Sequence, residues 1–188
     1  MSMDQEGSSR TRSLLVLGGA RSGKSAYALK LAEAYSPERL YLATAAAGDE
    51  EMAGRIARHR AERGRGWTTL EEPLEVARAL RAEAGPGRVI VVDCLTLWLS
   101  NLMLAGRDPG SAVAALADAI RALAGPAILI SNEVGMGIVP DHKLGREFRD
   151  WQGRANQEIT RACDAAILIA SGLPLRLKPA ATVGVQLG

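Results

Sequence analysis

The feature that most constrains this chain is the stretch GGARSGKS, which begins at Gly18 and ends at Ser25. An apolar run at residues 14–17 precedes it, and a helix-prone segment follows from residue 26. The spacing of glycine, four residues, glycine, lysine and serine is that of a phosphate-binding loop (P-loop) between a strand and a helix. Backbone N–H groups of such a loop converge on an anion, and the helix N-terminus adds partial positive charge. The alternative is an ordinary glycine-rich turn, but the flanking pattern favours a nucleotide phosphate site.

Individual residues of the loop have distinct expected tasks. Gly18 and Gly23 permit backbone angles and a close approach that a side chain would prevent. Lys24 is expected to reach the outer phosphates of a nucleotide, and the Ser25 hydroxyl to bind a magnesium ion. The loop therefore predicts a nucleoside triphosphate with Mg²⁺.

Length, composition and charge restrict the class of protein. The 188 residues suit a single domain at residues 13–188, behind a polar leader at residues 1–12 that we expect to be disordered. Apolar residues make up 47% of the chain, no run is long enough to cross a membrane, and a net charge of +2 suggests no nucleic-acid footprint. Cys94 and Cys163 lack metal-site spacing, so we expect free buried thiols in a reducing, cytoplasmic setting.

Apolar runs alternate with amphipathic segments along the chain. We expect strands at residues 14–17, 39–45, 67–70, 88–93, 127–130, 165–170 and, at an edge, 175–178. We expect helices at residues 25–35, 49–63, 74–84 (with Pro73 as first residue), 95–105, 110–123 and 141–164. This alternation predicts an α/β fold, with a mostly parallel sheet between helices on both faces.

The helix expected at residues 49–63 has an unusual polar face. Arg55, His59 and Arg63 recur at intervals of four residues, so they share one side of the helix. One interpretation is a solvated basic face. The other is a catalytic one: an imidazole among guanidiniums should have a lowered pKa and stay neutral near pH 7, where it can act as a nucleophile.

Polar residues follow several of the predicted strands. Asp93 ends a strand, where P-loop proteins place an acid that holds magnesium, although it could instead cap the next helix. Asn132 follows another strand, either as a ligand-binding group or as a simple cap. Since parallel strands end at one edge of the sheet, we expect Gly18, Thr44, Asp93 and Asn132 to share one site.

The last long helix, expected at residues 141–164, carries an apolar stripe. Gly145 and Gly153 predict a kink or break within it, and His142 at its start is interpreted as a surface residue. The residues expected to face the core are Leu144, Phe148, Trp151, Ala155, Ile159 and Ala162.

Four stretches in this order, GGARSGKS, DEEMAGRIARHRAER, DCLT from Asp93, and NEVGMGIVP from Asn132, resemble one enzyme family. It is the bifunctional adenosylcobinamide kinase / adenosylcobinamide-phosphate guanylyltransferase of adenosylcobalamin (vitamin B12) assembly. The resemblance spans about residues 13–178. It implies a three-layer P-loop NTPase fold of the recombinase-like type and assembly as a homotrimer.

The resemblance also implies two reactions and their residues. ATP or GTP phosphorylates adenosylcobinamide, and GTP then donates GMP to that phosphate through a guanylylated histidine, which matches His59. For these reactions we expect Lys24 and Asp93 to act in catalysis, and Ser25 and Asp93 to hold Mg²⁺ as the P-loop pattern indicates. The implied nucleotide contacts are Gly18, Gly19, Ala20, Arg21, Ser22, Gly23, Lys24, Ser25, Thr44, Ala45, Ala46, Arg60, Ala61, Glu62, Arg63, Glu71 and Asp93.

Two other functions are compatible with the sequence. The chain could be a small-molecule kinase with a single reaction, in which His59 is a surface residue. It could also be a recombinase-like ATPase that acts on DNA or a protein, although the near-neutral charge disfavours this class.

Overall fold

The computed structural model describes residues 11–45 and 66–179, and within them a seven-stranded sheet is the central element. The strand order is β3-β2-β4-β5-β1-β6-β7, in which every neighbouring pair is parallel except β6 and β7. The strands are β1 (Ser13–Gly18), β2 (Glu38–Ala43), β3 (Trp67–Glu71), β4 (Arg88–Asp93), β5 (Ala127–Asn132), β6 (Ala165–Ala170) and β7 (Leu173–Lys178). The mostly parallel sheet predicted from the sequence is confirmed.

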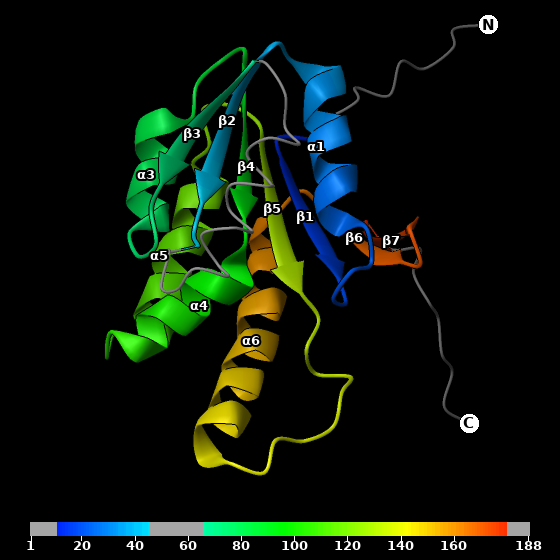
Figure 1. The fold of residues 1–188 in the computed structure, drawn as a ribbon. Helices are drawn as coiled ribbons and strands as arrows, with labels where there is room; N and C mark the ends of the chain where they lie inside the picture. Colours follow the sequence, from blue (N-terminus) through cyan, green and yellow to red (C-terminus); the bar gives the residue numbers. More distant parts are fainter. Residues whose placement is uncertain (1–10, 46–65, 180–188) are drawn as a thin grey trace, which may run out of the picture.

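Helices cover both faces of this sheet (Figure 1). Helix α1 packs on one face against β1, β4 and β5, whereas α4 packs on the opposite face, where α5 and α6 lie beside it and α3 lies beside α5. The helices are α1 (Lys24–Tyr35), α3 (Val76–Glu83), α4 (Leu95–Leu104), α5 (Pro109–Arg121) and α6 (Lys143–Ala162). The result is the expected three-layer α/β arrangement. None of the helices in the described ranges has the length and apolar character needed to cross a membrane.

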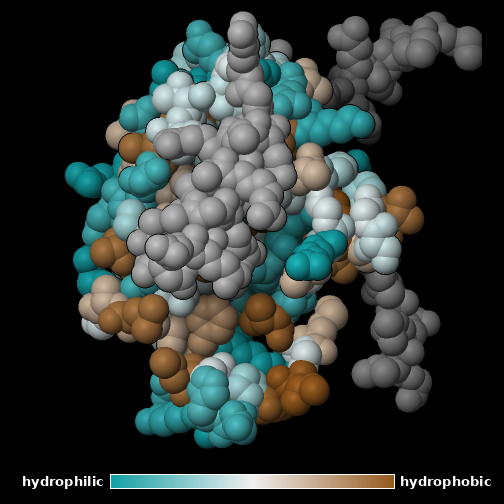
Figure 2. Space-filling model, viewed as in Figure 1, coloured by the Kyte–Doolittle hydropathy of each residue, from teal (hydrophilic) through white to brown (hydrophobic). Residues whose placement is uncertain are grey.

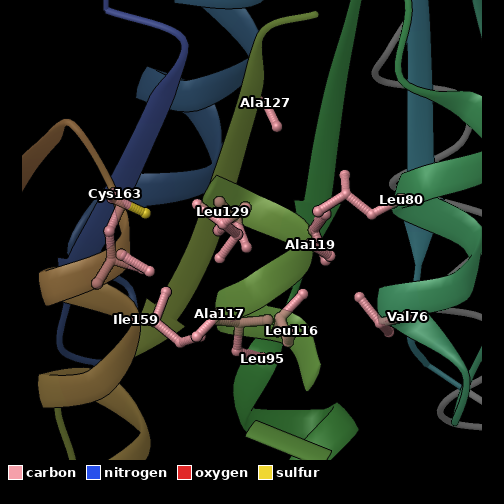
Figure 3. Packing of buried hydrophobic residues seen from close by; sticks show 14 of the residues in the cluster. Val76, Leu80, Leu95, Leu116, Ala117, Ala119, Ala127, Leu129, Ile159 and Cys163 are labelled. Atoms are coloured by element: carbon pink, nitrogen blue, oxygen red, sulfur yellow. The ribbon is translucent and has the colours of Figure 1, made fainter. Parts of the chain in front are cut away.

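Two hydrophobic clusters fill the space between these layers, because successive strand residues point to opposite faces. On β5, Leu129 joins the cluster beneath α3, α4, α5 and α6, and Figure 3 shows it beside Leu116, Leu95 and Ile159. Its neighbour Ile130 joins the cluster beneath α1. Strands buried on both faces explain why the sequence shows continuous apolar runs.

The parallel register brings the carboxyl ends of the strands to one edge of the sheet. Gly18 at the end of β1 pairs with Asn132 at the end of β5. Ala43 at the end of β2 pairs with Asp93 on one side and with Glu71 on the other. The predicted convergence of strand ends is therefore confirmed for every parallel strand that the sequence analysis singled out.

Some sequence-based details are wrong. Helix α3 begins at Val76 rather than at residue 74, because a Glu72 carboxylate oxygen accepts from the backbone N–H groups of Leu74 and Glu75 and holds a non-helical turn there. Helix α6 runs unbroken through Gly145 and Gly153. Leu144, expected in the core, is 51% exposed, because it lies in the first turn of α6, which extends beyond the sheet (Figure 1).

Other details agree with the sequence analysis or lie outside the described residues. Ala155, Ile159 and Ala162 are buried as expected, whereas Phe148 and Trp151 are partly buried. His142 is exposed, as predicted, and its ring also caps α6 by accepting from the Gly145 N–H group. The helix predicted at residues 49–63 lies outside the described ranges, and so do residues 1–10 of the leader predicted at residues 1–12.

Candidate active site

The P-loop joins the end of β1 to the start of α1, as its sequence predicts (Figure 1). Gly18 is buried, and a Cβ there would lie 2.8 Å from the Ile169 carbonyl oxygen and also against the Ser22 hydroxyl. Gly23 has a φ of 96°, a left-handed conformation that favours glycine, at the N-terminus of α1. Both motif glycines are therefore required by the loop geometry.

Lys24 lies across the mouth of this loop. Its Nζ donates to the Gly19 carbonyl oxygen at 3.0 Å. Burial lowers the pKa of Lys24, and the nearby Cys94 and Asp93 oppose that effect. An ammonium group beside a carboxylate at the start of a helix is well placed to neutralise phosphate charge.

Asp93 is fixed at the end of β4 by a neighbouring strand. The Tyr41 hydroxyl on β2 donates to its Oδ2 at 2.9 Å. Helix α4, which follows, has Cys94 as its N-cap without a side-chain hydrogen bond, so Asp93 is not the helix cap. The partly buried carboxylate lies on the same sheet face as α1, since it shares the alternation of Val89 and Val91.

Thr44 ties the end of β2 to the end of β4. Its hydroxyl donates to the Cys94 carbonyl oxygen at 2.7 Å and accepts from the Cys94 N–H group at 2.8 Å. Its own N–H group donates to the Asp93 carbonyl oxygen, and its carbonyl oxygen accepts from Asn101 Nδ2. The side chain is fully buried, and the peptide bond between Asp93 and Cys94 is cis. In this structure Thr44 supports the strand edge rather than facing the pocket.

A cavity of about 560 Å³ opens where these elements meet, between the P-loop and the ends of β2, β3 and β4. Its lining combines predicted contacts from the loop, Ala45, Glu71 and Asp93 with residues the sequence analysis had not assigned. The lining residues are Ala20, Arg21, Ser22, Gly23, Lys24, Ser25, Ala26, Tyr41, Ala43, Ala45, Thr69, Glu71, Asp93, Cys94, Leu97 and Asn132.

Several predicted site residues are not in this lining. Gly18 and Gly19 belong to the P-loop but not to the lining, and Thr44 is fully buried outside it. Other predicted contacts fall in the range that the structure does not describe, and for them the sequence prediction stands untested. They are Ala46, the proposed nucleophile His59, Arg60, Ala61, Glu62 and Arg63.

Tyr41 and Thr69 were missed by sequence reasoning, although a signal for them exists. Tyr41 and Ala43 alternate along β2, and Thr69 and Glu71 pair with them on β3, so all of them share one sheet face. That is the face of α1 and Asp93. The alternation identifies these residues once the order of the strands is known, and the sequence alone does not provide that order.

The residues present fit a magnesium ion. Mg²⁺ uses oxygen ligands and commonly takes only one or two from the protein, with phosphates and water completing its shell. Ser25 and Asp93 supply such oxygens in the same cavity. No group of three or more acidic, histidine or cysteine side chains suited to a resident metal occurs in residues 11–45 and 66–179. The donor set therefore suits a metal that arrives with a nucleotide.

The two cysteines are poor candidates for nucleophiles. Both are free and buried. Burial raises the pKa of Cys94 to about 11, with a further rise from Asp93, and burial raises the pKa of Cys163 to about 12. Both thiols therefore stay protonated at neutral pH, and the prediction that they are free and buried is confirmed.

Comparison with curated proteins finds close relatives over most of the chain. The bifunctional adenosylcobalamin biosynthesis protein CobP of Pseudomonas aeruginosa is 48% identical over 167 residues, covering 87% of this chain and 96% of that protein. The proteins named CobU from Salmonella typhimurium and Escherichia coli are 38% and 36% identical, each covering 88% of this chain and 99% of its own length.

Comparison with solved structures finds matches that are more distant in sequence. The P4 protein of bacteriophage phi6, solved with ADP, has a TM-score of 0.49 and 13% identity, and covers 87% of this chain and 52% of that one. The flagellar accessory protein FlaH of Methanocaldococcus jannaschii has a TM-score of 0.46 and 14% identity, and covers 84% of this chain and 70% of that one.

A family description matches almost the whole chain, over residues 14–177, with the P-loop, Asp93 and the Asn132 strand end inside the match. This confirms the resemblance drawn from the sequence motifs. The chain belongs to the family described as cobinamide kinase / cobinamide phosphate guanyltransferase.

Proposed function

We propose that this protein phosphorylates adenosylcobinamide with ATP or GTP and then transfers GMP from GTP to the new phosphate, releasing pyrophosphate and giving adenosylcobinamide-GDP. The observation that carries the proposal is the cavity in which the P-loop, Lys24 and Asp93 meet, in a chain that belongs to this family. Both reactions use a nucleoside triphosphate, so one phosphate site serves them in turn.

In the kinase step, a bond forms between the substrate hydroxyl oxygen and the terminal phosphorus, and the bond from that phosphorus to the bridging oxygen breaks. Lys24 and the loop N–H groups stabilise the charge that gathers on the departing diphosphate. Asp93 orients the attacking hydroxyl or accepts its proton, because it is the carboxylate that Tyr41 fixes beside the loop. Bound Mg²⁺, held by Ser25 and Asp93, would offset phosphate charge.

In the guanylyl step, we propose that a His59 ring nitrogen attacks the α-phosphorus of GTP, so that a P–N bond forms and pyrophosphate leaves. The phosphate of adenosylcobinamide phosphate then attacks the same phosphorus and releases the histidine. Covalent catalysis divides a displacement between two anions into steps that each have an activated partner. Glu71 on β3, at the exposed side of the cavity, is a proposed nucleotide contact.

We also propose that the active protein is a homotrimer in the cytoplasm. The connection from β5 to α6 exposes Met136, Ile138 and Val139 at 83%, 96% and 57%, and apolar surface gathers at the lower end of the molecule where this connection lies (Figure 2). Apolar surface of this kind supports an interface between copies. Light scattering on the purified protein measures the mass, and a monomer or dimer would contradict the trimer.

The function is tested by incubating the protein with adenosylcobinamide, Mg²⁺ and GTP and separating the corrinoids by chromatography with mass detection. We expect adenosylcobinamide phosphate first and adenosylcobinamide-GDP later, with pyrophosphate released in step with the second product. Accumulation of the phosphate alone would support a kinase with a single reaction. Absence of both products would overturn the proposal.

A further inference from the structure

The NEVGMGIVP stretch has no role in the proposed reactions, yet the structure fixes its first residue firmly. The Asn132 N–H group donates to the Thr96 hydroxyl on α4 at 2.8 Å. The Asn132 carbonyl oxygen accepts from Asn156 Nδ2 on α6 at 3.0 Å. Two helices therefore hold the main chain of one residue through side-chain hydrogen bonds.

A buried network beneath the strand end holds Asn156 in turn. The Ser131 hydroxyl donates to Asn156 Oδ1 at 2.7 Å, and Gln152 Nε2 donates to both oxygens at 3.0 Å. Ser131 and Gln152 are fully buried, and Asn156 is 5% exposed. Gln152 Oε1 is buried without a partner in the described part of the chain, but the hydrogen bonds to Asn156 Oδ1 turn the Asn156 amide nitrogen toward the Asn132 carbonyl oxygen.

The Asn132 carboxamide, in contrast, has no hydrogen bond within the described part of the chain. Its Oδ1 is buried and without a partner there, and so is the hydroxyl oxygen of Ser22 in the P-loop. Both residues line the same cavity as Lys24 and Asp93. Leaving a buried polar group unpaired costs about 1–3 kcal/mol, so the unpaired Asn132 carboxamide in this cavity points to a ligand that satisfies it.

The position of Asn132 indicates which part of a nucleotide it meets. It pairs in register with Gly18, where the P-loop begins, and the following Glu133 N–H group donates to the Gly18 carbonyl oxygen at 3.1 Å. It shares the alternation of Ile128 and Ile130, which face α1. It therefore lies between the loop and Asp93 on β4, the neighbouring strand, where the outer phosphates of a triphosphate belong.

We propose that Asn132 donates a hydrogen bond from its carboxamide to the terminal phosphoryl group of the bound triphosphate, and that Thr96 and Asn156 are positioning residues that aim it. The amide nitrogen and oxygen exchange places by rotation, so the donor can face the phosphate. A neutral amide suits this place, because Asp93 already supplies negative charge nearby. The expected effect of Asn132 on turnover rests on the proposed function, whereas the expected contact with the phosphate does not.

The contact predicts different effects on the proposed reactions. In phosphorylation the terminal phosphoryl group is the one transferred, so the Asn132 contact tightens as charge develops there. In guanylyl transfer that group leaves within pyrophosphate, and the bond that breaks lies one phosphate further away. Loss of Asn132 should therefore slow the kinase step more than guanylylation.

The primary test is nucleotide affinity, measured by calorimetry with Mg²⁺ and either GDP or the non-hydrolysable triphosphate analogue GMPPCP. Asn132→Ala should weaken the affinity for GMPPCP by about 10-fold or more, which is the contribution of one hydrogen bond to a charged group. The affinity for GDP should stay within about 2-fold of the wild-type value. Asn132→Asp should weaken GMPPCP further through charge repulsion. Gln157→Ala removes an exposed amide of α6 and is the matched control, with no change expected.

The positioning role is tested at Thr96. Thr96→Val keeps the shape and removes the acceptor of the Asn132 N–H group, so it should reproduce much of the GMPPCP loss, while Thr96→Ser should restore binding. The double variant Thr96→Val, Asn132→Ala should lose as much affinity for GMPPCP as Asn132→Ala alone, because both substitutions act through the same contact.

The outcomes separate the inference from the proposed function. An equal loss of GDP and GMPPCP affinity, or no loss of either, would overturn the terminal-phosphate contact. A selective GMPPCP loss in a protein whose wild type converts no corrinoid would support the contact and overturn the proposed function. With active wild type, Asn132→Ala should lower kinase kcat by about 100-fold, as removal of one transition-state donor does, with little change in KM for adenosylcobinamide.

Discussion

Thr44 offers a sharp test of how the strand edge is built. The sequence resemblance implies a nucleotide contact there, whereas the structure buries the residue completely and uses its hydroxyl to satisfy the Cys94 N–H and carbonyl groups. Thr44→Val keeps the volume and the branched shape but removes both hydrogen bonds. Any effect therefore reports the hydroxyl alone.

The magnitude follows from what the substitution leaves behind. Each buried backbone group that loses its partner costs about 1–3 kcal/mol, so losing both predicts about 2–6 kcal/mol of unfolding free energy. With a urea m-value of about 2 kcal/mol per molar, the unfolding midpoint should fall by at least about 1 M. GTP affinity, measured well below that urea concentration, should change much less, because the Thr44 side chain is not in the cavity lining.

Urea unfolding followed by circular dichroism, with GTP titration of the same samples, gives both quantities. Thr44→Ser retains the hydroxyl and is the matched control, with a midpoint close to the wild type. A Thr44→Val protein of normal stability that loses GTP affinity would refute the structural role and support a direct nucleotide contact.

Further predictions concern the core, an acid-sensitive contact and the thiols. Leu129→Ala should cost about 2–5 kcal/mol of unfolding free energy, because Leu129 is 0% exposed; a loss below about 1 kcal/mol in urea would contradict the packing in Figure 3. Burial raises the pKa of Asp164, but hydrogen bonds from the N–H groups of residues 12 and 13 outweigh it and leave the pKa below its usual value. A lowered pKa adds stability above about pH 4 that is lost as pH falls further, so Asp164→Asn should unfold at lower temperature at pH 7, and the difference should shrink below pH 4. Cys94 and Cys163 should not react with Ellman's reagent in the native state at pH 7.5 but should both react in urea; rapid native reaction would contradict their burial.

The framework of the fold follows from local sequence patterns. Continuous apolar runs predict strands buried on both faces, and the GGARSGKS spacing fixes the first turn between strand and helix. Asp93 ends β4 and Ala170 ends β6 where the sequence predicts. These features depend on residues that are neighbours in the chain, so one sequence is enough to find them.

Features that depend on partners far along the chain escaped prediction. The sequence leaves open whether Asn132 caps a turn or binds a ligand. In the structure Asn132 lines the cavity, and Thr96 and Asn156 from two helices hold its main chain. The burial of the Thr44 hydroxyl depends on its partner Cys94, which lies 50 residues away in sequence. Leu144 fits the apolar stripe of α6, and its exposure depends on where the sheet ends.

We propose that one P-loop site serves both phosphorylation and guanylyl transfer, and that only guanylyl transfer proceeds through His59. The most direct measurement uses GTP labelled at its α-phosphate, with the protein denatured and its label tested for stability in acid and alkali. We expect label on the wild type that is lost in acid and kept in alkali, as a phosphoramidate requires, and no label on His59→Ala, which still phosphorylates adenosylcobinamide. Equal labelling of both proteins, or an unlabelled wild type that still makes adenosylcobinamide-GDP, would contradict it.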